Sequence, residues 1–143
     1  MHHLLIPIDA GHVERTASAV AQAVKLHQAE PSQVHLLRVQ PPVSGHVAMM
    51  FPPAELHGLQ VDWAQEELAP AKQLLDAAGV PYDCTVKVGR SAPTIAAVAR
   101  ELGCDHVLFG EDRPGMAERL FGSLAEQVRH LLTTQGDPVV MGS

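Results

Sequence analysis

The stretch that decides the fold is CDHVLFGEDRPGMAERLFGSLAE, which runs from Cys104 to Glu126. Its short apolar run, Val107–Phe109, predicts a buried strand that stops at Gly110. A polar loop follows, and Gly122-Ser123 then opens a segment with helical periodicity. A strand, a glycine loop and a helix N-terminus form a geometry in which backbone N–H groups and the helix dipole can hold an anion. The stretch therefore predicts the ligand site of the protein.

The loop carries charges that bear on this prediction. Glu111 and Asp112 follow Gly110 directly, so two carboxylates stand where a phosphate would approach. Arg113 beside them could hold a phosphate through parallel hydrogen bonds, or it could be neutralised by the two acids. A divalent cation between the carboxylates and a triphosphate would remove the repulsion. Phosphate binding and internal charge pairing thus remain alternatives.

Ser123 also has a purely structural explanation. With Glu126 it forms a Ser-x-x-Glu capping box, worth about 1 kcal/mol to a helix. A bound phosphate would compete for the same N–H groups, so helix capping and phosphate binding are alternative roles for this serine.

Strands and helices alternate along the rest of the chain. Apolar runs predict strands at 4–8, 34–39, 82–88 and 138–141, and periodicity predicts helices near 17–28, 54–78, 91–102 and 124–132. In the helix at 54–78 we expect Pro70 to bend or break the helix and Gly79 to end it. Its predicted inner face comprises Leu56, Leu59, Trp63, Leu68, Ala71, Leu75 and Ala78.

Five strands interleaved with four helices predict one domain, residues 1–143, of the α/β class. The expected architecture is an open five-stranded, mostly parallel sheet with helices on both faces. Ligands of such sheets bind at the carboxyl ends of the strands, where the strand order reverses. Asp9, Val39 and Gly110 all lie at predicted strand ends of this kind.

The composition narrows the classes of function. The chain is 46% hydrophobic with a mean hydropathy of +0.05, as expected of a soluble domain. Its net charge of -6 and its 3% aromatic content argue against a nucleic-acid surface. No run approaches membrane-spanning length, and the N-terminal residues lack the apolar length of a signal peptide. We therefore expect a cytoplasmic protein that contacts neither nucleic acid nor membrane.

The cysteines and histidines, which often bind metals or carry redox chemistry, show no spacing typical of a metal or redox site. Cys84 and Cys104 are far apart, each in a predicted strand, and read as buried free thiols in a reducing cytosol. The histidines show no metal-ligand spacing, so we expect no metal site and solvated or strand-edge roles for them. They are His2, His3, His12, His27, His35, His46, His57, His106 and His130.

No catalytic signature is present either. The sequence has no Gly-x-Ser-x-Gly elbow, no Walker-type phosphate loop and no Cys-x-x-Cys pair. A pyrophosphatase loop is also absent after the first strand, which continues as Asp9-Ala10-Gly11-His12. We therefore expect no enzymatic activity, although slow ATP hydrolysis is compatible with the sequence.

Taken in order, several motifs resemble those of the universal stress protein family. They are Ile-Pro-Ile-Asp at 6–9, the apolar strand at 34–39 leading into prolines, Val88-Gly89 before a helix, the strand ending in Gly110 with the later Leu-Phe-Gly-Ser at 120–123, and Asp-Pro-Val-Val at 137–140. The resemblance covers the whole chain. It implies a five-stranded α/β fold related to the adenine nucleotide α-hydrolases, and often a homodimer, here through Val139–Met141.

The resemblance also implies a ligand. One branch of the family binds ATP through Gly-x2-Gly-x9-Gly-Ser/Thr, whereas another lacks this motif. Gly110 matches the first glycine and Gly122-Ser123 match the terminal pair. Arg113 stands where the second glycine belongs, and the spacing from it to Gly122 is one residue short. The phosphate loop is therefore degenerate.

The remaining contacts follow from the same resemblance. The N–H of Leu124 would join the phosphate site, and Asp9 and Val39 match the positions that face the ribose and adenine. This implies a stress-response protein with an adenine-nucleotide cleft, with ATP and Mg²⁺ as the expected ligands. The alternative is a dimeric interaction module of the branch that binds no nucleotide.

Overall fold

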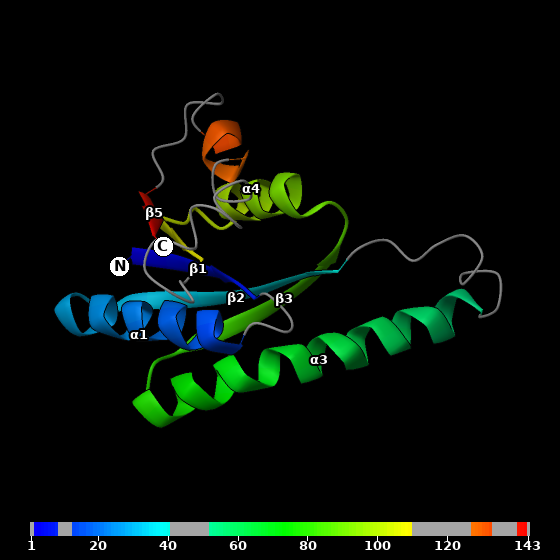
Figure 1. The fold of residues 1–143 in the computed structure, drawn as a ribbon, viewed down its shortest axis with the longest axis horizontal. Coiled ribbons are helices and arrows are strands. Elements are labelled where there is room, and N and C mark those ends of the chain that lie inside the picture. The colour runs from blue at the N-terminus through cyan, green and yellow to red at the C-terminus, as the bar shows by residue number, and fades with distance from the viewer. Residues whose placement is uncertain (1, 9–12, 41–51, 110–126, 133–139, 143) are drawn as a thin grey trace.

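A computed structural model of the chain describes residues 2–8, 13–40, 52–109, 127–132 and 140–142. Strands and helices alternate along these residues, as the sequence predicts (Figure 1). The elements are β1 (His2–Pro7), α1 (Val13–Ala29), β2 (Ser32–Gln40), α3 (Pro53–Ala78), β3 (Tyr82–Val88), α4 (Ser91–Glu101), β4 (His106–Leu108) and β5 (Val140–Gly142), and residues 127–132 are also helical.

The five strands form one sheet in the order β3-β2-β1-β4-β5, and every neighbouring pair is parallel. The predicted fold class is therefore confirmed. The order runs outward from β1 in one direction to β3 and in the other to β5, so the strand order reverses between β1 and β4. We call this junction the β1–β4 seam. Such a reversal point is where open α/β sheets bind their ligands.

The seam is narrow compared with the junction on the other side of β1. β1 pairs with β2 along its whole length, from His2 opposite Ser32 to Pro7 opposite Leu37. Its pairing with β4 covers only Leu4 opposite His106 and Leu5 opposite Val107. The sheet thus consists of a broad part, β1 to β3, and a smaller part, β4 and β5, that is joined to it by few ladder positions.

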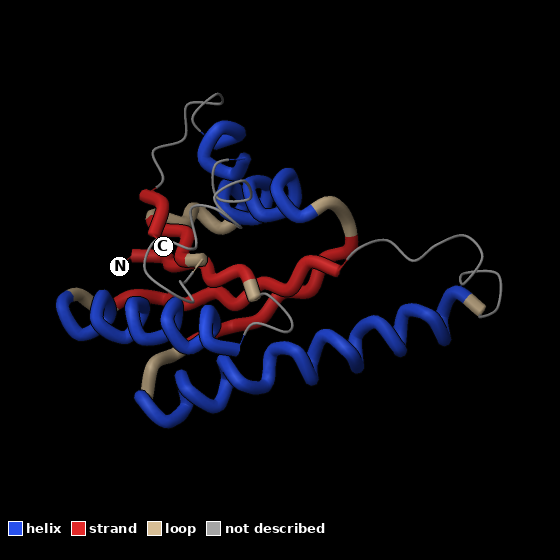
Figure 2. Tube along the Cα trace, in the orientation of Figure 1, coloured by secondary structure: helices blue, strands red, loops and turns tan. Residues whose placement is uncertain are grey.

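Helices cover both faces of the sheet (Figure 2). α1 and α3 lie on one face, and α4 and the helical residues 127–132 lie on the other (Figure 1). Successive residues of β1 point to opposite faces. Leu4 and Ile6 accordingly join the core under α1 and α3, whereas Leu5 joins the core under α4. Strands buried on both faces explain the near-continuous apolar runs in the sequence.

α3 is longer than the sheet that it covers. Its 26 residues span about 39 Å, whereas the nine residues of β2 span about 30 Å. The first turns of α3 therefore project past the carboxyl end of β2 (Figure 1). Two predicted assignments to the inner face of α3 are wrong, because Trp63 is 49% exposed and Ala78 is also exposed. Leu68, Ala71 and Leu75 are fully buried, as predicted.

The predictions for Pro70 and Gly79 in α3 have different outcomes. The sequence predicts that Pro70 bends or breaks the helix; the helix continues through Pro70, so it is not broken there. Gly79 ends it as predicted, in the left-handed conformation with φ of 70° that favours glycine. The N–H of Gly79 donates to the Asp76 carbonyl at 3.1 Å, and the N–H of Val80 donates to the Leu75 carbonyl at 3.0 Å. These bonds satisfy carbonyls that the helix itself leaves open.

Both cysteines are free. Cys104 is buried, but it lies just before β4 rather than within a strand, and Cys84 in β3 is only partly buried. Burial raises the pKa of the Cys104 thiol to about 12. A thiol in that state stays protonated and is a poor nucleophile, as expected of a packing residue.

Two neighbouring leucines on different faces of α3 should differ in how much they contribute to the free energy of unfolding. Leu75→Ala removes a fully buried side chain and should lower the free energy of unfolding by about 2–5 kcal/mol. Leu74→Ala, at a side chain that is 41% exposed, should cost about 1 kcal/mol or less. Urea denaturation of the two variants measures this difference. Equal losses would contradict the assignment of the buried face.

Candidate functional site

The candidate site is the carboxyl edge of the sheet. The chain leaves β1 through Ile8, whose N–H donates to the Leu37 carbonyl at 2.7 Å. After β3, the N–H of Gly89 donates to the Gln40 carbonyl at 2.9 Å. These bonds continue the parallel pairing beyond the strand ends, so the edge formed by the first three strands is fixed in register. A rigid edge of this kind is what a precise binding site requires.

Val39 is the one predicted site residue that lies within the described residues. It is the penultimate residue of β2, at the carboxyl edge as expected. Its side chain is 6% exposed and packs in the core under α4, and its carbonyl accepts a hydrogen bond from Arg38 Nη1 at 2.8 Å. Val39 can therefore shape the floor of a cleft. The other predicted site residues, Asp9, Gly110, Arg113, Gly122, Ser123 and Leu124, lie outside the described residues.

The sequence reading missed Gln40, which lies next to Val39. Gln40 is 5% exposed, and its Nε2 donates to the Gln60 carbonyl on α3 at 3.0 Å. Its Oε1 is buried without a hydrogen-bond partner among the described residues. A buried acceptor in this state lowers stability until a donor reaches it. A polar residue at the end of the strand, directly before two prolines, was the available sequence signal.

An ion pair fixes α3 against this edge. The Arg38 side chain on β2 donates through Nε to a carboxylate oxygen of Glu67 on α3. The two side chains are 17% and 26% exposed, so both charges are largely removed from water. A pair at this depth is costly to break on one side only, because the remaining charge loses its partner. The pair therefore holds α3 at a fixed height over the end of β2.

A double-mutant cycle tests this coupling. Arg38→Met and Glu67→Gln should each lower the free energy of unfolding by about 1–3 kcal/mol. Combining them should cost less than the sum of the two, with a coupling of about 1 kcal/mol or more. Denaturation of the two single variants and the double variant gives the number. Additive losses would show that the two side chains act independently.

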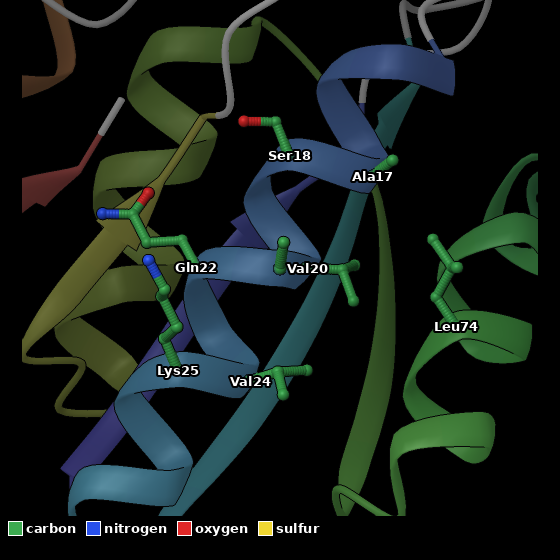
Figure 3. Close-up of a pocket in the computed structure, with 8 residues that line it drawn as sticks. Ala17, Ser18, Val20, Gln22, Val24, Lys25 and Leu74 are labelled. Carbon is green, nitrogen blue, oxygen red and sulfur yellow. The ribbon is translucent and has the colours of Figure 1, made fainter.

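A groove of about 570 Å³ lies between α1 and α3. Figure 3 shows Val20 and Val24 of α1 on the side that faces Leu74 of α3, while Gln22 and Lys25 lie on the other side of α1. The groove runs along the outer surface of the helix layer, whereas ligands of open α/β sheets bind at the strand ends. We therefore keep the carboxyl edge as the candidate site.

Within the part of the chain that the structure describes, no three His, Cys, Asp or Glu side chains converge as a metal centre would require. Likewise, none of the described helices is both long enough and apolar enough to cross a membrane.

Comparison with known proteins shows to which family the chain belongs. The family described as "Universal stress protein family" matches residues 1–135 of the 143. The chain belongs to the universal stress protein family. The family match covers all the residues that form β1 to β4, including both strands of the β1–β4 seam. No curated protein sequence gives a significant match.

Solved structures of the family share the fold of this chain. A universal stress protein in complex with cAMP is 18% identical, with a TM-score of 0.67 over 99% of this chain and 97% of that one. The Archaeoglobus fulgidus protein in complex with dAMP is 15% identical, with a TM-score of 0.65 over 99% and 97%. An Arabidopsis thaliana family member with AMP bound is 12% identical, with a TM-score of 0.63 over 99% and 91%.

Proposed function

We propose that this universal stress protein binds an adenine nucleotide at the carboxyl edge of its sheet and acts in a stress response through that ligand. The observation that carries the proposal is the reversal of strand order at the β1–β4 seam, since ligands of open α/β sheets bind at this place. The complexes of related proteins with cAMP, dAMP and AMP support the ligand class.

The proposed contacts divide into two groups. Asp9 and Val39 would lie near the ribose and adenine, at the ends of the first two strands. The phosphates would lie at the degenerate loop, with Gly110 and Arg113 on one side and the N-terminus of the last helix on the other, at Gly122, Ser123 and Leu124. Helix N-termini favour anions because unpaired N–H groups and the helix dipole point at them. ATP with Mg²⁺ is the ligand that we propose.

A thermal-shift titration tests the proposal. ATP, ADP, AMP and cyclic AMP are added separately, each with and without Mg²⁺. A nucleotide at a hundredfold excess over Kd adds about 2.7 kcal/mol of stability. For a domain of this size the expected rise in Tm is about 5–10 °C. The Gly122→Val variant, which places a side chain in the phosphate loop, should lose this shift.

The titration also separates the proposed function from its alternative. Without a shift from any of the four nucleotides at millimolar concentration, the chain would be assigned to the branch that binds no nucleotide. Its function would then be that of a dimeric interaction module. A shift that the Gly122→Val variant retains would place the nucleotide elsewhere on the protein.

We further propose that the protein is cytoplasmic and is not an enzyme. The support is the lack of a catalytic signature in the sequence, which offers no general base for rapid hydrolysis. Slow ATP hydrolysis is compatible with this proposal. The nucleotide would act as a signal that changes how the protein binds its partners.

The proposed homodimer forms through Val139–Met141. The support is that β5 is an edge strand of the sheet that the described residues form, and an edge strand can pair with a second copy. Light scattering after size exclusion should give twice the 15.3 kDa mass of one chain. Val139→Glu should yield monomers, because like charges would then meet across the two-fold axis. Val88→Glu, on the opposite edge strand β3, should leave the dimer intact; dissociation of both variants would contradict the proposed interface.

A further inference from the structure

The amino edge of the sheet carries a cluster of titratable side chains, at the opposite end of the strands from the candidate nucleotide site. His2, the first residue of β1, lies between two carboxylates. Its Nδ1 is 2.9 Å from Asp105 Oδ2, and its Nε2 is 2.8 Å from Glu30 Oε2. Glu30 follows the end of α1, and Asp105 directly precedes β4. The ring of His106 on β4 packs against His2 edge-on, with the centroids 6.1 Å apart.

This geometry fixes the charge of His2. An ionised carboxylate only accepts hydrogen bonds, so each ring nitrogen must carry a proton to bond to its oxygen. A neutral imidazole has a single N–H and could satisfy Asp105 or Glu30, but not both. The arrangement therefore requires an imidazolium at His2, and the loss of one proton breaks one of its two charge-assisted bonds.

The cluster spans the narrowest junction of the sheet. Asp105 Oδ2 accepts a second hydrogen bond from the N–H of His3 at 3.1 Å, and the Asp105 N–H donates to the His3 carbonyl at 2.8 Å. The His2 and His3 contacts therefore fasten β1 to the residue that leads into β4. These polar contacts add to the two described ladder positions and to the buried apolar core that also join β1 to β4.

We propose that His2 is a proton-controlled clasp on the β1–β4 seam, closed as the imidazolium between Asp105 and Glu30 and loosened when the ring loses its proton. This inference goes beyond the proposed function and does not depend on nucleotide binding. The carboxyl end of the same seam holds the proposed cleft, so the proton state of His2 sets how firmly the two sides of the cleft are joined at their far end.

The pKa shifts agree with the geometry and give the pH window. Hydrogen bonds to Asp105 and then to Glu30 raise the pKa of His2 above 6.5. A raised pKa contributes stability that is fully present below pH 6.5 and is lost as the pH rises through the folded value. The bond to His2 lowers the pKa of Asp105 below 3.8, so the contribution of Asp105 is lost only under acid conditions. The clasp is thus closed at mildly acidic pH and opens on the alkaline side.

His3 and His35, at the same edge of the sheet, have a different hydrogen-bond arrangement. His35, which is buried on β2, places Nδ1 2.7 Å from Asp83 Oδ1, so this nitrogen carries a proton. Its Nε2 is 3.0 Å from His3 Nδ1, and the two rings are nearly parallel. When both rings are neutral, His3 must donate from Nδ1 to His35. The contacts of His35 are thus compatible with two neutral rings, unlike the two contacts of His2.

Nitrogen-15 NMR of histidine-labelled, untagged protein tests the protonation states. His2 should show two protonated ring nitrogens at pH 6 and a titration midpoint above 6.5. The Glu30→Gln variant, at an exposed side chain, should lower the His2 midpoint because one carboxylate is lost. A His2 midpoint at or below 6.5, or no change in Glu30→Gln, would overturn the proposal.

Hydrogen exchange tests the effect on the seam. At pH 6 the His2→Gln variant should exchange the β4 amides about two- to fivefold faster than the unmodified chain, since exposed ion pairs are individually weak. Exchange in β2 and β3 should not change. His130→Gln, at an exposed histidine on the helical residues 127–132, is the matched control and should leave β4 unchanged. Uniform acceleration of all strands, or none in β4, would overturn the clasp.

The pH dependence of stability is a further test of the role of His2. The difference in urea midpoint between the unmodified chain and His2→Gln should be larger at pH 6 than at pH 9, since the unmodified chain loses the charge and one of the two bonds at residue 2 as the pH rises. High salt should reduce the difference at pH 6, because the ion pairs are exposed and screened. A difference that is the same at both pH values would show a packing role for His2 instead of a protonation role.

Discussion

The parallel pairing of β1 with a strand on each side is the constraint on which the rest of the structure depends. Parallel neighbours cannot be joined by a hairpin, so each connection crosses a face of the sheet as a helix. The connections after β1 and β2 carry α1 and α3 over one face, and α4 covers the other. β1 is thereby buried on both faces, which explains why Leu4, Leu5 and Ile6 are fully inaccessible.

The same arrangement gives the two edges of the sheet different chemistry. At the carboxyl edge, β3 leads through Gly89 and Arg90 into the N-terminus of α4, and helix N-termini favour anions. At the amino edge the chain returns from helix C-termini and carries the histidines and carboxylates around His2 and His35. The proposed ligand site and the proposed proton clasp therefore lie at opposite ends of one seam. Both depend on the reversal of strand order there.

Two polar contacts near the candidate site connect α3 to β2, and one polar atom there has no described partner. The Arg38–Glu67 pair and the bond from Gln40 to the Gln60 carbonyl secure α3 over β2, so they fix the geometry of the edge. Oε1 of Gln40 is buried and has no hydrogen-bond partner among the described residues, so within that part of the chain it can accept a further hydrogen bond at this edge.

The sequence by itself determined the order of strands and helices, the fold class and the C-terminal stop of α3, because these depend on local periodicity and on a backbone conformation that glycine favours. It also located Val39 at a strand end. It did not determine which side of α3 is covered, since Trp63 was assigned to the inner face but is 49% exposed, whereas the neighbouring Ala64 is fully buried. Nor did it indicate that His2, Glu30 and Asp105 meet, or that His3, His35 and Asp83 do. Those residues are far apart along the chain, and only the strand order, which depends on long-range packing, brings them to one edge.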